Sequence, residues 1–350
     1  MAKQTRLATR EGNRAKLMAA ARAEFAERGY PATKVDAVAA RAGLTRGAVY
    51  SNFPSKRALY FAVLAEDAEA AAADGGQARK KTQKDALGAL ARAFVARLPL
   101  ATAPTHLGAH LLSEVMADDR TRQAYTQLMK LSALQIGFAL GHLGGTRPRV
   151  RQAEAALTIL EGARQFAAAA PGLVEPFHIV QTCENLPDLE TAWRFPDQLP
   201  PTKVLDDPWS PGDATDLAHD APADLTSTGL VAILGVHRLS AIEEAIREMP
   251  DNEDITLVVV SADPGELVGL VRLTVAETRA HLRQAFPPAS VPRLRVVVDP
   301  DGTIAAAAGV TGVSDTTEVA LRIAGGRIKL RSEGFAACAA SSLHDTKAPR

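Results

Sequence analysis

The sequence predicts a multidomain protein, with an all-α N-terminal part followed by an α/β C-terminal domain. Up to about residue 194, apolar residues recur with the period of amphipathic helices. Residues 195–229 contain six Pro and seven Asp without such a period, so they are expected to form an extended linker. From residue 230 onward, short runs of branched apolar residues indicate buried strands.

The N-terminal 60 residues are expected to form a compact set of short helices. Leu17 and Phe25 belong to one apolar stripe, which predicts a first helix over about residues 10–28. Thr33 is expected to cap the second helix. The second, third and fourth helices are predicted at about 33–42, 45–52 and 55–73.

A second helical domain is expected over residues 61–194. Its apolar stripes are interrupted by clear breaks, such as Gly144-Gly145 and Pro171-Gly172. Further helices are predicted at about 84–98, 105–117, 119–143, 149–169 and 173–193.

Residues 33–57 predict a helix-turn-helix, in which a second short helix is held against the major groove of DNA. Val49 and Phe53 can face the core, which leaves the opposite side of that helix exposed. Arg46 is suited to bidentate donation to a guanine edge. Gly47 would cost an isolated helix about 1 kcal/mol, which suggests that the backbone approaches DNA closely there.

The candidate DNA-binding residues lie on this exposed side or at helix starts. Free N–H groups and the positive end of the helix dipole make a helix start suitable for phosphate. Ala48 can touch a thymine methyl group, and Tyr50 can offer its hydroxyl to a phosphate. The full set is Thr33, Lys34, Thr45, Arg46, Gly47, Ala48, Tyr50, Ser51, Asn52 and Lys56.

Charge is distributed unevenly, although the formal net charge is zero. Residues 1–60 hold 12 Lys/Arg and 4 Asp/Glu, a difference of +8, so residues 61–350 hold 28 and 36, a difference of −8. A basic segment attracts double-stranded DNA, whereas an acidic body is repelled by it. The asymmetry would therefore orient the protein on DNA.

The helix-turn-helix resembles that of the TetR/AcrR family of bacterial regulators. The similarity covers about residues 10–62 and lies in Thr33, Val38-Ala39, the run Ala42–Tyr50, the run Asn52–Lys56, and Leu59. Asn52 stands where many members have His. The resemblance implies that residues 1–60 are a DNA-binding domain and that residues 61–194 bind a small-molecule effector and dimerise. It also implies a homodimeric repressor on a palindromic operator, which the effector releases.

An apolar effector cavity with a few polar groups is the expected kind of pocket in this second domain. His106, His110 and Glu114 share one helix face and could instead hold a metal ion, but no metal is expected, because cavity lining or plain exposure is commoner. The candidate pocket residues are His106, His110, Glu114, Tyr125, Gln135, Gln165 and His178.

Stripes of small and apolar residues on helices 149–169 and 173–193 are typical of a four-helix interface between two copies. These residues are Ala153, Ala156, Leu157, Leu160, Ala163, Ala167, Val174, Phe177 and Val180.

An α/β layer domain is expected over residues 230–335, followed by a flexible tail over 336–350. Strands alternate with helices and end in a hairpin around Gly325-Gly326. The predicted strands are 230–235, 255–260, 294–298, 318–323 and 327–330, and the predicted helices are about 240–249 and 274–286.

Residues 296–310 and 316–334 resemble a thioredoxin-like or peroxiredoxin-like domain. Redox chemistry needs a thiolate where the first strand meets its helix, but residues 235–244 contain no Cys. Thr317 stands where the supporting cis-Pro is expected, and Cys338 falls in the expected tail. The resemblance therefore implies a redoxin fold without its chemistry, and no enzyme activity is expected.

The remaining features narrow the class of protein. Cys183 and Cys338 fit no metal or disulfide spacing, no signal peptide is evident, and no apolar run is long enough to span a membrane. A cytoplasmic protein without a cofactor or a membrane partner is expected. Two alternatives stay open: a thiol-dependent redox enzyme or redox sensor with a DNA-binding head, and an architectural DNA binder without an effector.

Overall fold

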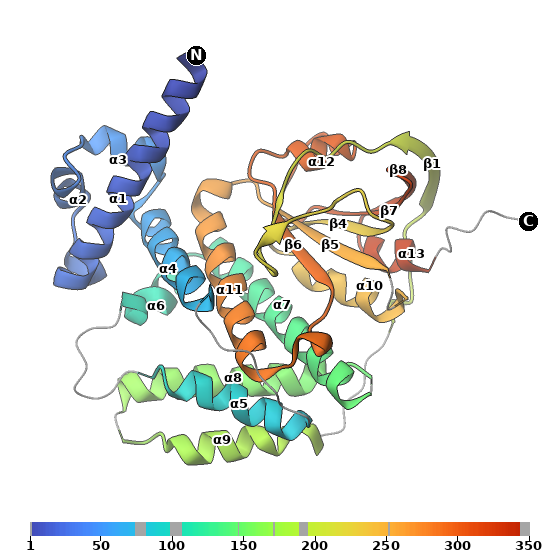
Figure 1. Cartoon of the computed structure of the whole chain (residues 1–350), viewed down its shortest axis with the longest axis horizontal. Coiled ribbons are helices and arrows are strands. Elements are labelled where there is room, and N and C mark those ends of the chain that lie inside the picture. The colour runs from blue at the N-terminus through green and yellow to red at the C-terminus, as the bar shows by residue number, and fades with distance from the viewer. Residues whose placement is uncertain are drawn as a thin grey trace, which may run out of the picture.

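The structure is a computed structural model, which describes residues 2–73, 82–98, 107–145, 147–170, 172–188, 195–250 and 253–343, with side chains from residue 10 onward. Figure 1 shows a small helical head, a helical body and a sheet with its own helices. Within the described residues, no helix is both long and apolar enough to cross a membrane.

The head contains three helices, α1 (Ala2–Ala32), α2 (Val35–Arg41) and α3 (Arg46–Asn52). Gly29 has a φ of 73°, which interrupts the regular helical backbone where the sequence predicts the end of the first helix. Phe25, Val49 and Phe53 are all buried in the core of the head. The predicted order of helices is therefore confirmed here, although α1 starts before residue 10.

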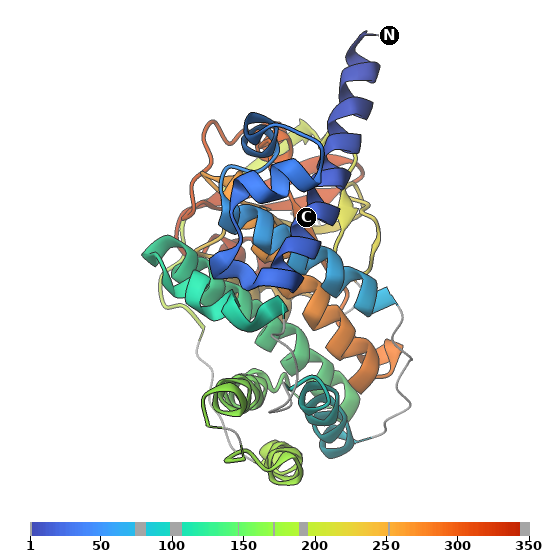
Figure 2. The ribbon, with the colours of Figure 1, turned by 90° about the vertical axis from the view of Figure 1, so that its left-hand side faces the viewer.

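The helical body follows α4, which leads away from the head (Figure 2). α7 starts at a well-formed cap, because the Asp118 carboxylate accepts a hydrogen bond from the amide of Thr121 at 2.9 Å. Two predicted helices are shorter than expected, since 105–117 becomes a 3-10 turn plus α6, and α9 ends at Glu184. The elements are α4 (Lys56–Ala73), α5 (Gln83–Val95), η1 (Leu107–His110), α6 (Leu111–Met116), α7 (Asp119–Gly144), α8 (Val150–Ala169), α9 (Pro176–Glu184) and η2 (Leu186–Asp188).

The C-terminal part is built on a mixed six-stranded sheet in the order β1-β8-β7-β4-β5-β6. β4, β5 and β6 are parallel neighbours, whereas β7, β8 and β1 add antiparallel strands on the other side of β4. β4 is buried along its whole length, which explains its continuous apolar sequence. The strands are β1 (Thr202–Pro208), β4 (Gly229–Gly235), β5 (Asp254–Val260), β6 (Leu294–Val298), β7 (Glu318–Ala324) and β8 (Arg327–Glu333), and the shorter helices are η3 (Leu239–Ala241), α10 (Ile242–Glu248), η4 (Pro288–Ser290) and α12 (Thr303–Ala307).

Residues 195–229 are not the extended linker that their composition predicts. β1 pairs with β8 at the edge of the sheet, and β2 (Thr215–Asp216) pairs with β3 (Ala221–Pro222) in a small hairpin. Trp209 is buried and donates its indole N–H to the carbonyl of Leu225 at 2.8 Å. An edge strand exposes most of its side chains, so β1 has no apolar alternation that the sequence could reveal.

The C-terminal tail prediction is also wrong for the residues that precede 344. Residues Ala337–Ser342 form α13, and Cys338 within it is fully buried. The Ser341 hydroxyl donates to the carbonyl of Ala320 on β7 at 3.2 Å. Small side chains let this helix lie close against the sheet, so their small size here reflects tight packing rather than exposure.

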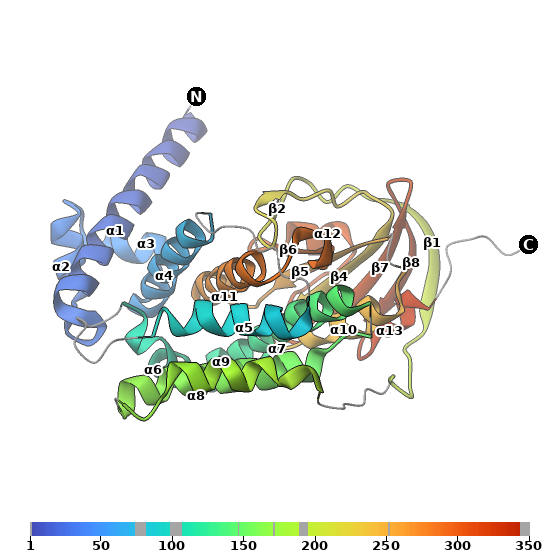
Figure 3. The same cartoon turned by 60° about the horizontal axis from the view of Figure 1, so that its bottom comes forward.

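The longest helix of the C-terminal part, α11 (Pro264–Ala285), packs into the helical body. α4 and α11 lie side by side in Figures 1 and 3, and a Cβ at Gly269 would lie 2.9 Å from the amide nitrogen of Ala62 on α4. α11 begins ten residues before the predicted helix at 274. One hydrophobic core consequently runs from Leu17 in the head to Cys338 in α13.

Candidate DNA-binding surface

The turn between α2 and α3 sets the position of the predicted reading helix. Gly43 has a φ of 66°, which allows the tight reversal after α2. Thr45 caps α3, because its hydroxyl accepts a hydrogen bond from the amide of Ala48 at 3.2 Å. Val49 anchors the inner side of α3 in the core.

The outer side of α3 is exposed, as the sequence predicts. The Arg46 side chain is 62% exposed, and its guanidinium lies 3.2 Å from the Asp36 carboxylate and 5.6 Å from the centre of the Tyr50 ring. Thr45, Gly47 and Ser51 are exposed as well. An exposed ion pair of this kind is weak, so the guanidinium can turn toward a ligand at little cost.

Gly47 has no neighbour that excludes a larger side chain. A Cβ added there would meet only the Thr45 hydroxyl, at 3.8 Å. The packing of the head therefore gives no reason for glycine at this position of α3.

The predicted phosphate anchors differ in how accessible they are. Lys34 is exposed at the start of α2, where it takes the N-cap position predicted for Thr33. Thr33 is 2% exposed and donates its hydroxyl to the carbonyls of Glu24 and Gly29, because the break in α1 leaves those carbonyls nearby. The Thr33 hydroxyl is thus already hydrogen-bonded within the head and is not exposed to a phosphate.

Lys56 and Asn52 are also partly engaged within the protein. The Lys56 ammonium lies 4.3 Å from the centre of the Tyr30 ring and donates to the carbonyl of Pro31 at 3.3 Å, and burial lowers the pKa of the amine. The Asn52 amide donates to the carbonyl of Ala48 at 2.8 Å. An ammonium has three donors, so Lys56 keeps donor capacity for a phosphate.

The candidate effector residues do not converge on one cavity in the structure. His106 lies outside the described residues. Glu114 accepts a hydrogen bond from the Tyr30 hydroxyl at 2.8 Å, and the His110 ring stands 6.4 Å from the same tyrosine ring. These contacts join η1 and α6 to the head rather than lining a pocket.

The other candidates are dispersed over the body. Gln165 and His178 are exposed, Gln135 is buried beside a cavity of about 10 Å³, and Tyr125 is half-buried on α7. α11 contributes buried side chains, such as His281, to the interior of the body, which the sequence pattern of residues 61–194 alone could not predict. No group of three His, Cys, Asp or Glu residues suited to a metal ion occurs within the described ranges.

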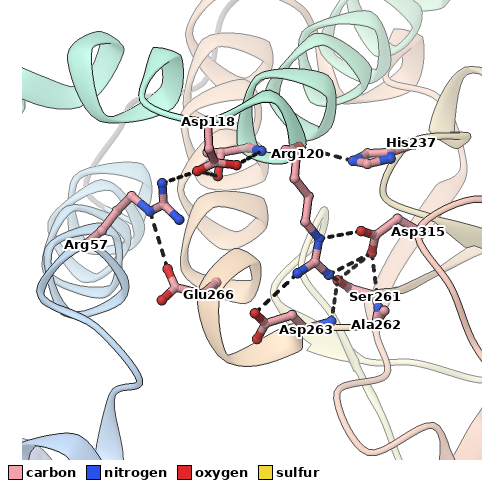
Figure 4. Close-up of polar contacts among 10 residues, drawn as sticks. Arg57, Asp118, Arg120, His237, Ser261, Ala262, Asp263, Glu266 and Asp315 are labelled. Atoms are coloured by element: carbon pink, nitrogen blue, oxygen red, sulfur yellow. Dashed lines mark hydrogen bonds and ion pairs between the residues drawn. The ribbon is translucent and has the colours of Figure 1, made fainter.

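A polar junction joins the head, the body and the C-terminal part (Figure 4). Arg57, at the start of α4, contacts the carboxylate of Asp118, and its Nε lies 3.3 Å from Glu266 of α11. Arg120 of α7 contacts Asp315 and donates to the Ser261 hydroxyl at 3.1 Å. Sequence patterns could not reveal these two arginines, because Asp315 lies 195 residues after Arg120 and Glu266 lies 209 residues after Arg57.

The segment that leads from β4 to η3 is covered by α7. His237 Nε2 lies 3.1 Å from the carbonyl of Arg120, and the amide of Ser240 donates to the Gln127 side chain at 2.9 Å. Burial raises the pKa of Cys338 and raises that of Cys183 to about 11. Neither thiol is thus poised to become a thiolate.

A buried acidic pair next to Cys338 leads to a pH prediction. Burial, together with nearby Glu318, raises the pKa of Glu244 from 4.5 to about 7. A carboxyl whose pKa is higher in the folded chain contributes stability that is present below its unfolded pKa and lost as the pH rises through the folded value. The contribution of Glu244 to the free energy of unfolding should therefore fall between about pH 4.5 and 7.

Denaturant unfolding at several pH values, with Glu244→Gln beside the parent chain, measures this contribution. The variant should lose that part of the pH dependence, whereas Glu248→Gln, which changes an exposed glutamate on the same helix, should keep it. An unchanged slope in Glu244→Gln would contradict the prediction.

Comparison with known proteins identifies the head. Residues 17–63 match the family described as bacterial regulatory proteins, tetR family. The chain is similar to a solved TetR transcriptional regulator from Rhodococcus sp. RHA1, with 19% identity, 51% of this chain and 98% of that chain covered, and a TM-score of 0.36. A second transcriptional regulator from the same Rhodococcus is 23% identical, with 49% and 92% covered and a TM-score of 0.33. No curated protein matches the chain. Through the family match, residues 17–63 are an N-terminal domain of the TetR family.

Proposed function

We propose that the chain is a sequence-specific DNA-binding transcriptional regulator, a repressor that binds a near-palindromic operator as a homodimer and responds to a small molecule. The observation that carries the proposal is the exposed side of α3, where Arg46, Gly47 and Tyr50 are accessible in a domain that matches the TetR family. The basic charge of residues 1–60 supports the same partner.

Two copies are proposed to meet through the outer faces of α8 and α9. Phe166, Leu173 and Phe177 are 53%, 64% and 70% exposed, which is unusual for a cluster of large apolar residues. The predicted stripe on α8 needs correction, because Ala153, Leu160 and their neighbours Ala156, Leu157 and Ala163 are buried within the protomer. All of them except Ala163 belong to a core that they share with residues of α5, α7, α9 and α11.

For the C-terminal part, we propose a thioredoxin-like fold that acts as a sensing or docking module. The parallel strands β4 to β6 followed by the antiparallel β7 and β8 support this fold. The alternative, a thiol-dependent redox enzyme, requires an accessible thiolate, and the burial of Cys183 and Cys338 argues against it. Thiol-dependent peroxide turnover by the intact protein would favour that alternative.

Footprinting the intact protein on DNA that flanks its own gene tests the proposed function. The expected result is protection of a short palindromic site, with affinity that falls as salt rises. Equal affinity for all sequences would overturn it.

The variant Gly47→Ala tests the contact of α3 with DNA without disturbing the fold. The variant should fold and be as stable as the parent chain or more so, by up to about 1 kcal/mol, since a Cβ has room there. Its affinity for the operator should nevertheless fall, because the added methyl group keeps the backbone of α3 away from DNA. Thermal unfolding and fluorescence anisotropy with a labelled operator measure the two effects.

The control is Gly312→Ala, at another open glycine, in the C-terminal part and outside the head, α8 and α9. It should leave the affinity for DNA unchanged. Undiminished operator binding by Gly47→Ala would remove the argument for close backbone approach.

A further inference from the structure

A cavity of about 310 Å³ lies between α4, α11 and the β2–β3 hairpin. It is far larger than the two cavities of about 10 Å³ that lie elsewhere along α11, and its volume reaches the range of small-molecule sites. Its lining combines charged and apolar groups: Glu69, Thr215, Leu217, Asp220, Arg272, Ala276 and Arg279.

Arg279 forms the buried end of this cavity and has hydrogen-bonding capacity left. Its side chain is 8% exposed, it donates from one terminal nitrogen to the carbonyl of Leu217 at 3.2 Å, and it lies 3.4 Å from the Asp220 carboxylate. Its Nε is buried and has no hydrogen-bond partner among the residues that the structure describes. A guanidinium has five N–H donors, so Arg279 keeps donors beyond these two contacts for an acceptor from outside the chain.

Arg272 supplies a second guanidinium on the same face of α11. It makes a bidentate pair with Glu69 of α4, at 2.8 and 2.6 Å. Arg279 follows Arg272 by seven positions along α11, which is about two helical turns. Ala276 lies between the two arginines, and its side chain is only a methyl group. The two guanidinium groups therefore flank a gap with a small apolar floor.

We propose that this cavity binds a small organic carboxylate, held between Arg279 and Arg272 with its apolar body against Leu217 and Ala276. The planar, doubly donating guanidinium matches a carboxylate in shape and charge. The ligand carboxylate replaces Glu69 as the partner of Arg272.

Loss of the Arg272–Glu69 pair would remove one of the ion pairs that fix α4 against α11. α4 is tied to α11 by Arg57–Glu266 at its start and by Glu69–Arg272 near its end. α4 follows α3 after three residues, so a shift of α4 moves the reading helix. This consequence rests on the proposed function, whereas binding itself does not.

The test is isothermal titration of the full chain, without DNA, with sodium benzoate at constant ionic strength. Saturable binding of benzoate is expected, and benzamide, which has the same shape without the charge, should bind at least tenfold more weakly. Inorganic phosphate should also bind more weakly. Equal binding of benzamide or phosphate, or no binding of benzoate, would overturn the proposal.

Variants locate the site. Arg279→Gln should weaken benzoate binding at least tenfold, whereas Arg283→Gln, with the same loss of charge one turn further along α11, should leave it within about twofold. Ala276→Leu fills the cavity floor without a charge change and should also abolish binding, which keeps the test decisive if Arg279→Gln fails to fold. Unchanged binding in Ala276→Leu would overturn the site.

A final arm distinguishes the two proposals. Benzoate binding without any preferred DNA site would leave the cavity assignment standing and overturn the proposed function. Operator binding by a chain that ignores benzoate would do the reverse.

Discussion

Arg46→Ala should lower the affinity of the protein for its operator by about ten- to a hundredfold and remove the preference at one base pair. A bidentate contact between arginine and a base edge contributes about 1–3 kcal/mol of discrimination against a wrong base. The 62% exposure of the side chain, and its weak pairing with Asp36, leave the guanidinium available for such a contact. Anisotropy titrations on operators with single base-pair changes measure the effect.

Arg41→Ala is the matched control for Arg46→Ala. Its guanidinium pairs with Glu24 and Glu27 of α1, so it is engaged within the head. Removing it should leave the base preference unchanged. If Arg46→Ala instead weakened binding equally on every sequence, Arg46 would be a phosphate contact rather than a base reader.

Arg238→Ala should destabilise the protein by about 3 kcal/mol, the lower end of the cost of leaving a buried charge alone, because Arg238 is 31% exposed while its partner Glu318 is buried. Two nitrogens of Arg238 donate to one oxygen of Glu318 at 2.9 and 2.6 Å, and the Glu318 side chain is only 2% exposed. After the substitution, that carboxylate keeps the amide of Ala337 as a donor on its other oxygen. Urea unfolding measures the loss.

Two further variants test whether the loss comes from the Arg238–Glu318 pair. Arg327→Ala removes an exposed pair with Asp206 and should cost no more than about 1 kcal/mol. The double variant Arg238→Met/Glu318→Leu should recover part of the stability, because no buried charge is then left without its partner. Equal losses in Arg238→Ala and Arg327→Ala would contradict the assignment of a buried pair.

Local sequence patterns predicted the head and the strands well. The stripe of Leu17 and Phe25, the turn glycine Gly43 and the runs that became β4 and β5 all act over a few residues, so they are visible in sequence. The exposed side of α3 followed from the placement of Val49 and Phe53 in the core.

Contacts between distant segments could not be predicted in the same way. The partner of β1 is β8, more than a hundred residues later, and the strand itself exposes most of its side chains. The Thr33 hydroxyl donates to a backbone carbonyl of α1 only because the helix is interrupted at Gly29. The cavity at Arg279 exists only because α11 lies along α4, and no periodicity within either helix reveals that pairing.

The continuous core that joins Leu17 to Cys338 has a consequence for experiments on fragments. A chain cut after residue 194 would lose α11, which packs against Phe61 of α4 and is hydrogen-bonded to Ser132 of α7, and such a fragment should aggregate instead of folding on its own. Heating the intact chain should correspondingly give one cooperative transition for both halves, so a label placed in either half would report the melting of the other.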